Sequence, residues 1–418
     1  MHDQTIEHQP SCEDELNIGL LTVAQAQARI LDGVTPVTDA ETVPVREALG
    51  RVLAEDIISP IDVPSHTNSA MDGYAVRADD LPAEGVREFT VPGTSWAGRP
   101  WPDPIEPGQA VQIMTGGMMP AGADTVVMQE QVEREADTVR IGSGHRCGQN
   151  VRQAGEDLAT GQQVFSAGRL LSAADIGVLA SLGLGETRVW RRLKVAFFST
   201  GDELRPVGEP LGPGEIHDSN RYTLYGMLEK LGVEIIDLGV VRDRRELIEQ
   251  AFRAAAESAD AIITSGGVSV GEADFVRETL EKLGSMSVWK IAMKPGRPVT
   301  FGRINDAVFF GLPGNPVSVM VTFFVFVRQA LRKMTGATGA SDVLTLHART
   351  STPLRKRPGR FEFQRGVLEQ TAPGEFTVRS AGAQGSGILR SMSEANCFIL
   401  LDPDRTGVDA GEQVEVQP

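Results

Sequence analysis

The sequence predicts a multidomain protein in which a parallel-sheet α/β domain is combined with two β-rich domains. Residues 193–335 repeat a strand–turn–helix rhythm, which is typical of a parallel α/β sheet. Residues 61–160 contain frequent Pro and Gly and only short strand-like runs. After residue 343, alternating apolar residues are separated by turn residues at short intervals, which predicts a small β-barrel or sandwich.

Length and charge limit the possible classes of protein. At about 150 residues per domain, 418 residues correspond to about three domains. The chain carries 40 Lys and Arg against 56 Asp and Glu, and its net charge of −16 disfavours binding to nucleic acid or to an anionic membrane. A partner that bears phosphate must therefore meet local cations or a metal ion.

Cysteine usage and apolar runs predict a cytoplasmic protein. The three cysteines, Cys12, Cys147 and Cys397, are scattered and lack the spacing of a disulfide framework or a zinc site. Residues 1–15 are polar and acidic, unlike a signal peptide. The most apolar run, residues 317–327, is too short to span a bilayer. We therefore expect neither secretion nor a membrane segment.

The elements of the α/β domain can be assigned in order. Strands are expected at residues 194–198, 233–241, 261–263, 288–293 and 307–310, with a hairpin before the last of them. Asn220 is expected to cap the first helix, and Asn315 the last, with Pro316 in its first turn. Nearer the N-terminus, Thr22 and Gln25 have the spacing of a capping box for another helix.

Polar loops follow nearly every strand of this domain. They read Ser199-Thr-Gly-Asp-Glu203, Arg242-Asp243, Ser265-Gly-Gly-Val-Ser-Val-Gly271, Lys294-Pro-Gly-Arg297 and Pro313-Gly-Asn-Pro316. In an open α/β sheet, ligands bind beyond the carboxyl ends of the strands. The pattern therefore predicts one polar rim at this edge of the sheet.

The stretch Ser265–Gly271 is the strongest candidate for an anion site. Gly266 and Gly267 can adopt positive φ angles and point successive N–H groups at one spot, and a helix N-terminus behind them suits a phosphate. A plain strand-to-helix turn is the alternative. The stretch matches neither the P-loop motif nor the Gly-x-Gly-x-x-Gly dinucleotide fingerprint.

Carboxylates and cations are expected on the same rim. They are Asp202, Glu203, Asp243, Asp274, Lys290, Lys294 and Arg297. Carboxylates suit Mg²⁺, which bridges to phosphate oxygens, and cations neutralise charge on a leaving phosphate. Asp243 with Glu246 also has the spacing of a capping box, Asp274 can cap its helix, and Arg297 can be a solvated turn residue. The residues alone indicate a Mg²⁺-dependent enzyme acting on a nucleotide or a pyrophosphate-like compound.

Seven motifs occur in order along the chain. They are Asn68-Ser-Ala-Met-Asp-Gly-Tyr-Ala75, Ile113-Met-Thr-Gly116, Gly155-Glu-Asp157, Phe198-Ser-Thr-Gly-Asp-Glu203, Ser265-Gly-Gly-Val-Ser-Val-Gly271, Lys294-Pro-Gly-Arg-Pro298 and Leu312-Pro-Gly-Asn-Pro316. With them, the sequence resembles the molybdopterin molybdenumtransferases, which insert the metal in molybdenum cofactor biosynthesis and are related to the E domain of gephyrin. The resemblance runs from about residue 18 to the end of the chain.

The resemblance implies a reaction and a set of roles. In that family, adenylylated molybdopterin and molybdate are converted to molybdenum cofactor and AMP with Mg²⁺. The implied catalytic residues are Asp72, Glu203, Asp243, Asp274, Lys290 and Lys294, and the implied metal ligands are Asp202, Glu203 and Asp243. The implied substrate contacts are Thr115, Arg152, Asp157, Ser265, Gly266, Gly267, Ser269, Gly271, Pro313, Asn315 and Pro316. Molybdate would lie near Arg297, Ser318, Arg365 and Ser386.

The resemblance also implies an architecture and partners. The expected parts are a disordered tail (1–17), an N-terminal helix and extended linker domain (18–60 and 158–192), a β-rich domain (61–157), a three-layer α/β molybdopterin-binding domain (193–342) and a C-terminal β-barrel (343–418). Family members are homodimers, so Asp72, Thr115, Arg152 and Asp157 would complete the site of the other subunit. Further expected partners are the upstream adenylyltransferase and the apoenzymes that accept the cofactor.

Two other functions remain open, and one residue departs from the family pattern. A relative that shares only the α/β domain would be a molybdopterin adenylyltransferase or a nucleotide pyrophosphatase. A non-catalytic scaffold like the E domain of gephyrin is the third interpretation. Arg297 stands where some relatives carry lysine; the charge is kept, but the forked guanidinium grips an oxyanion differently.

Overall fold

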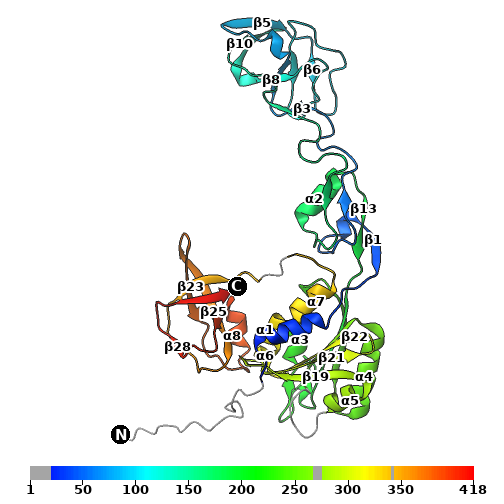
Figure 1. Ribbon diagram of the computed structural model, residues 1–418, viewed down its shortest axis with the longest axis vertical. Helices are drawn as coiled ribbons and strands as arrows, with labels where there is room; N and C mark the ends of the chain where they lie inside the picture. The colour runs from blue at the N-terminus through cyan, green and yellow to red at the C-terminus, as the bar shows by residue number, and fades with distance from the viewer. Residues whose placement is uncertain (1–19, 267–274, 340–342) are drawn as a thin grey trace. The chain divides into compact units, whose positions relative to one another are not determined.

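The computed structural model describes residues 20–266, 275–339 and 343–418 (Figure 1). The chain divides into two compact units: unit 2 is Thr42–Val189, and unit 1 contains the described residues on either side of it in the sequence. The tail expected at residues 1–17 lies outside the described residues. The predicted division into smaller domains stays a prediction.

A mixed six-stranded sheet forms the centre of unit 1. Its strands, in spatial order, are β17 (Glu234–Val241), β14 (Lys194–Thr200), β18 (Ala261–Ser265), β22 (Ala307–Leu312), β21 (Pro298–Ile304) and β19 (Gly284–Lys290). Of these six, only β21 runs opposite to the others. Between β21 and β22 the chain has only Asn305 and Asp306, and so tight a connection reverses its direction. The α/β prediction is confirmed, with this one strand reversed.

Helices cover both faces of the sheet, as a three-layer domain requires (Figure 1). One face is covered by α4 (Arg245–Ser258) and α5 (Phe275–Leu283), and the other by α3 (Ser219–Glu229), α6 (Pro316–Thr322), α7 (Arg328–Met334) and α1 (Val23–Asp32). Side chains alternate along a strand, so Phe197 packs toward the α3 face and Phe198 toward α4. The ring of Phe198 meets Phe252 of α4 edge-on, with centroids 5.1 Å apart.

Two of the predicted helix starts are confirmed. Thr22 accepts a hydrogen bond from the Gln25 N–H, and the Gln25 side chain accepts from the Thr22 N–H, which completes the capping box before α1. Asn315 occupies the N-cap position of α6, where its side chain makes no capping hydrogen bond, and Pro316 stands in the first turn. A π-helical segment, Phe323–Val327, joins α6 to α7, so the three segments form one continuous helical run.

A closed β-barrel forms the C-terminal part of unit 1. Its strands pair in the ring β25 (Phe361–Ala372), β26 (Glu375–Ser380), β23 (Leu346–Thr350), β29 (Gln413–Gln417) and β27 (Cys397–Leu401), and β27 pairs again with β25. Ile399 and Val416 are fully buried inside it. The same region contains β24 (Leu354–Arg355), α8 (Arg390–Glu394) and β28 (Gly407–Val408). The predicted C-terminal β-barrel is confirmed.

Unit 2 consists largely of short strands, as expected. A four-stranded sheet has the order β6 (Thr94–Ser95), β7 (Val111–Ile113), β4 (Gly73–Val76) and β8 (Thr125–Met128). A three-stranded sheet has the order β5 (Val86–Thr90), β10 (Thr138–Gly142) and β9 (Val132–Glu135). Two-stranded ladders join β3 (Asn68–Ser69) to β11 (Val151–Arg152), β2 (Ile57–Ile58) to β12 (Gln163–Phe165), and β1 (Ala40–Pro44) to β13 (Glu186–Trp190), and α2 is Ala173–Ser181.

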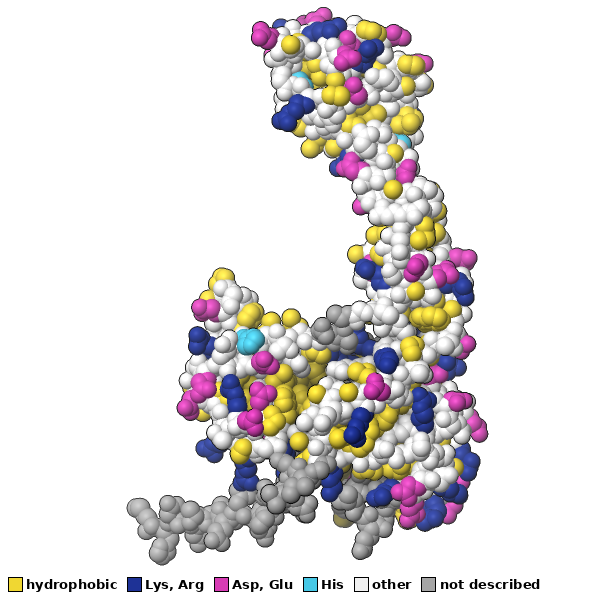
Figure 2. Space-filling view, viewed as in Figure 1, with side chains coloured by type: hydrophobic (Ala, Val, Ile, Leu, Met, Phe, Trp, Pro, Cys, Tyr) yellow, Lys and Arg dark blue, Asp and Glu magenta, His cyan; other side chains and the backbone are white. Residues whose placement is uncertain are grey.

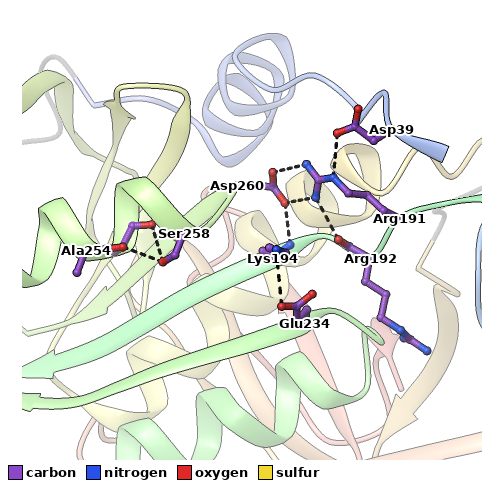
Figure 3. A network of polar contacts seen from close by, with 9 residues as sticks. Asp39, Arg191, Arg192, Lys194, Glu234, Ala254, Ser258 and Asp260 are labelled. Carbon is purple, nitrogen blue, oxygen red and sulfur yellow. Dashed lines mark hydrogen bonds and ion pairs between the residues drawn. The ribbon is translucent and has the colours of Figure 1, made fainter. Parts of the chain in front are cut away.

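Arg191 anchors a polar network at the amino ends of the sheet strands (Figure 3). Its guanidinium donates two hydrogen bonds of 2.7 Å to the carboxylate of Asp260, just before β18, and one of 3.1 Å to Asp39. The Lys194 N–H, at the start of β14, donates to Asp260 at 2.8 Å. The network therefore ties the segments before and after unit 2 to the start of the sheet.

We expect Asp260→Ala to lower the free energy of unfolding by about 2 kcal/mol, because Arg191, whose side chain is only 29% exposed, would lose its bidentate partner. Burial raises the pKa of Asp260, but the hydrogen bonds from Arg191 and Lys194 outweigh burial and leave it below 3.8. The contribution is therefore complete above pH 3.8 and disappears as the pH falls through the folded pKa. Urea unfolding at several pH values measures this contribution to the free energy of unfolding. Asp39 is the more exposed partner of Arg191, so Asp39→Ala should lower the free energy of unfolding by less. Equal losses from both variants would contradict this assignment.

Candidate active site

The strand register brings the predicted site loops of unit 1 to one edge of the sheet. Lys290 of β19 pairs with Pro298 of β21, and Ser265 of β18 pairs both with Leu312 of β22 and with Ser199 of β14. Six strands spaced by about 4.8 Å give this rim a length of about 24 Å. The rim that was expected from the sequence is thus formed by the carboxyl ends of five strands and the amino end of β21.

Gly266 opens the glycine turn at the centre of the rim. Its φ of +86° lies in the left-handed region, and a Cβ at this position would lie 2.6 Å from the Thr200 carbonyl oxygen. Its N–H donates to the Leu312 carbonyl at 3.2 Å, so Gly266 fixes the start of the turn and does not offer its own N–H to an anion. The preceding Ser265 is buried, with its Oγ 3.4 Å from Ser199 Oγ. The other predicted members, Gly267, Ser269, Gly271 and Asp274, lie outside the described residues.

Two of the predicted metal ligands lie side by side on the rim. The Asp243 N–H donates to Asp202 Oδ1 at 3.3 Å, and the Glu203 carboxylate lies over Gly201, where a Cβ would be 2.5 Å from Glu203 Oε2. Within the described part of the chain, no three His, Cys, Asp or Glu side chains gather closely enough to hold a metal by themselves. This donor set still fits Mg²⁺, which commonly takes one or two carboxylates and completes its shell with water and phosphate oxygens.

The capping role considered for Asp243 is wrong. Helix α4 begins at Arg245, and its N-cap is Arg244, so the box with Glu246 that the spacing predicted does not form. The reason is that the chain stays extended through Arg244, at φ −123° and ψ 129°. Asp243 therefore lies before the helix, next to Asp202.

Asn220 is a rim residue whose placement the sequence did not predict. Asp218, two residues earlier, caps α3 by accepting the Arg221 N–H at 3.1 Å, so the predicted capping by Asn220 is wrong. Asn220 instead donates through Nδ2 to the Gly314 carbonyl at 2.7 Å, in the loop after β22. A Cβ on Gly314 would lie 4.0 Å from Gly266 Cα, so this bond holds the predicted substrate loop Pro313–Pro316 against the glycine turn. The sequence did contain a signal for this arrangement, because Asp218 is an equally good N-cap residue two positions before Asn220.

The predicted cations follow β19 at the end of the rim. Lys290 is the last residue of β19 and is exposed, and Arg297 directly precedes β21. Between them, Lys294 belongs to β20 (Met293–Lys294), which pairs with barrel strand β25. The Arg297 Nε is buried and has no hydrogen-bond partner among the described residues. On the viewed face of the molecule, acidic and basic side chains are interspersed (Figure 2), and the net charge of the chain is −16. An anionic ligand would therefore depend on cations such as these three.

The barrel meets the N-terminus of α6 at the predicted molybdate residues. The Val317 N–H donates to the Ser386 carbonyl at 3.1 Å, and the neighbouring Ser318 is buried. Arg365 is also buried, and it donates to Ser391 Oγ and to the carbonyls of the loop before Ser386. Burial lowers the pKa of Arg365 to about 10. Arg365 therefore shapes this loop from beneath.

Unit 2 contains the four remaining predicted residues. The Thr115 N–H and hydroxyl each donate to Asp72 Oδ1 at 2.7 Å, and these bonds hold the pKa of Asp72 below 3.8. Arg152 lies on β11, whose partner strand β3 ends shortly before Asp72, and Asp157 follows in the next loop. Gly73 is required beside Asp72 because a Cβ there would lie 2.1 Å from the Val127 carbonyl oxygen. The structure thus joins Asp72 to Thr115 directly.

Comparison with known proteins covers nearly the whole chain. Three family descriptions match it: "MoeA N-terminal region (domain I and II)" over residues 21–183, "Probable molybdopterin binding domain" over residues 196–333, and "MoeA C-terminal region (domain IV)" over residues 347–418. The molybdopterin molybdenumtransferase of Haemophilus influenzae is 45% identical over 400 residues, which cover 96% of this chain and 98% of that protein. The chain belongs to the molybdopterin molybdenumtransferase family.

Other members of the molybdopterin molybdenumtransferase family agree. The molybdopterin molybdenumtransferase of a Nostoc species is 35% identical over 414 residues, covering 97% of this chain and 93% of that protein. The solved structure of the molybdopterin biosynthesis MoeA protein from Pyrococcus horikoshii OT3 matches with a TM-score of 0.82 and 32% identity, covering 95% of this chain and 99% of that one.

Family membership decides between the functions that the sequence left open. The matches over residues 21–183 and 347–418 lie outside the α/β domain, which contradicts a relative that shares this domain alone. The curated members are named as transferases, so the prediction of an enzyme is confirmed over that of a scaffold. In the described part of the chain, no helix is both long enough and apolar enough to cross a membrane.

Proposed function

We propose that the chain transfers molybdenum from molybdate to adenylylated molybdopterin and releases molybdenum cofactor and AMP, with Mg²⁺ as cofactor. The observation that carries the proposal is the common rim, on which the glycine turn, the carboxylates and the cations follow neighbouring strands. A rim about 24 Å long suits an extended substrate that has a pterin at one end and a nucleotide at the other.

The carboxylates and the glycine turn would hold the phosphate-bearing part of the substrate. Asp202 and Asp243 would hold Mg²⁺, with Glu203 beside them. When bound, Mg²⁺ neutralises charge on phosphate oxygens. The turn that Gly266 opens would bind the phosphate end of the pterin, and the loop Pro313–Pro316, fastened by Asn220, would close over it. This assignment leaves the nucleotide end to the carboxylate side of the rim.

The cations at the other end of the rim would meet the incoming oxyanion. Lys290 and Lys294 would neutralise the phosphate or molybdate charge, and the unpaired Nε–H of Arg297 offers a donor to a tetrahedral dianion. Ser318 and Ser386 would add hydroxyl donors near the N-terminus of α6. Arg365, being buried, would shape the Ser386 loop and add positive potential from beneath.

The decisive experiment supplies the purified chain with adenylylated molybdopterin, molybdate and Mg²⁺ and follows AMP release and cofactor formation. We expect both products to appear together, and neither to form after Mg²⁺ is removed with a chelator. Substrate that stays intact after many equivalents of enzyme would overturn the proposal. AMP release at a rate that changes neither with molybdate nor with the chelator would instead indicate a pyrophosphatase.

We also propose a homodimer in which Asp72, Thr115, Arg152 and Asp157 serve the rim of the other copy. If so, mixing the inactive variants Asp72→Asn and Asp243→Asn under conditions that exchange subunits should restore part of the activity, because mixed dimers contain one intact site. Each variant alone is the control. A mixture as inactive as its components, in a preparation where sedimentation shows mixed dimers, would contradict shared sites.

A further inference from the structure

A buried barrel carboxylate, Glu362, faces one of the rim cations. Strand β20 pairs in parallel with β25, and this register sets Lys294 directly opposite Glu362. Glu362 is only 5% exposed, and its Oε1 lies 3.7 Å from the Lys294 Nζ. A buried carboxylate is costly unless it is paired, so this contact needs an explanation.

Glu362 is held in place from inside the barrel. The Gln364 side chain donates to Glu362 Oε2 at 2.9 Å and also to the Arg355 carbonyl at 2.8 Å, which fixes one oxygen of the carboxylate. The other oxygen, Oε1, is the one that faces Lys294. The Lys294 side chain is about half exposed, so the flexible partner is the lysine and the fixed partner is the glutamate.

Glu362 also acts on a second lysine, Lys356. Lys356 is buried, and its ammonium donates to the carbonyls of Arg357, Pro403 and Arg405. Burial lowers its pKa, and Glu362, Asp402 and Asp404 oppose that shift. Lys356 therefore has three carbonyl acceptors and two acids besides Glu362, whereas Glu362 is the one of these three acids that forms an ion pair with Lys294 in the described structure.

We propose that Glu362 is a positioning residue that aims the Lys294 ammonium at the anionic substrate. A lysine on a four-carbon stem samples many directions in water, and a fixed, desolvated carboxylate at its flank leaves far fewer. The link also makes the barrel part of the active site, since β25 presents Glu362 to the rim and Arg365 to the Ser386 loop. The inference rests on the proposed function, in which Lys294 meets molybdate or phosphate.

The test compares Glu362→Gln with Asp402→Asn in the molybdate-dependent assay. Glutamine keeps the size of the side chain and removes its charge, so Lys294 loses its fixed partner. We expect the KM for molybdate to rise about tenfold, the effect of one lost hydrogen bond to a charged group, with a smaller change in kcat. Asp402→Asn removes an acid that faces Lys356 and should leave KM unchanged. The melting temperatures of both variants show whether the barrel stays folded.

A double-mutant cycle separates positioning from a merely structural role. If Glu362 acts through Lys294, Glu362→Gln should add nothing to the KM of Lys294→Met, and Glu362→Asp should restore part of the loss. An unchanged KM in Glu362→Gln, or an equal rise in the Lys294→Met background, would overturn the inference. Failure of the proposed function would look different, because the unmodified chain would then release either no AMP or AMP at a rate that does not depend on molybdate.

Discussion

Gly266→Val is expected to weaken substrate binding strongly and to lower the free energy of unfolding by about 3 kcal/mol. At a φ of +86°, a valine is strained before it meets any neighbour, and its Cβ would lie 2.6 Å from the Thr200 carbonyl oxygen. The strand end must therefore move, and the Gly266 N–H would lose its bond to the Leu312 carbonyl. Because the turn and the loop after β22 shift together, we expect affinity for molybdopterin to fall about 100-fold, as fluorescence titration would show.

The matched control is Gly374→Val, in the hairpin between β25 and β26. Gly374 has a similar φ of +81°, but a Cβ there meets no described atom within 4 Å. It should therefore show the cost of backbone strain alone, roughly 1–2 kcal/mol, with unchanged affinity. If Gly266→Val bound molybdopterin as tightly as Gly374→Val does, the turn could not belong to the binding site.

The parts of the fold that follow from local sequence patterns were predictable. Buried strands followed by polar turns identified β14, β17, β18 and β22, because each pattern lies within a short stretch. A hairpin was predicted before residue 307, and Asn305-Asp306 forms its turn, but residues 298–304 were not assigned as β21, the first strand of that hairpin. The barrel was predictable as alternating strands, but its closure depends on the long-range pairing of β25 with β27.

The sequence predicted which loops form the site, but it did not predict which side chains of those loops contact one another. The rule that ligands lie beyond strand ends brought Asp202, Asp243 and Gly266 to one rim, and the register of the strands agrees. The bond from Asn220 to Gly314 spans 94 residues, and the ion pair of Lys294 with Glu362 joins the rim of the six-stranded sheet to the C-terminal barrel. No periodicity or spacing encodes such pairs, because tertiary packing alone decides which side chains meet. The turn from Gly267 onward, with Asp274, stays a prediction.

Lys294→Met is expected to reduce kcat/KM for molybdate insertion about 100- to 1000-fold, with the fold intact. Lys294 lies on the rim beside Arg297, and its ammonium is the one rim cation that the described structure pairs with a buried carboxylate. Removing it takes a positive charge from the place where the anionic reactants would meet, and the missing charge matters most where negative charge develops. Methionine keeps most of the length of the side chain, so β20 should still pair with β25. Steady-state AMP release at varied molybdate measures the effect.

The decisive comparison is with Lys282→Met, because Lys282 is also an exposed lysine in an ion pair, at 2.8 Å from Glu249, but lies on α5. An exposed pair of this kind is worth little, so its loss should change neither activity nor stability by much. Lys294→Arg keeps the charge and should recover part of the activity, limited by the different shape of the guanidinium. If Lys294→Met worked within about threefold of the unmodified chain, the oxyanion would have to be met by Lys290 and Arg297 instead, and the buried Glu362 would need another purpose.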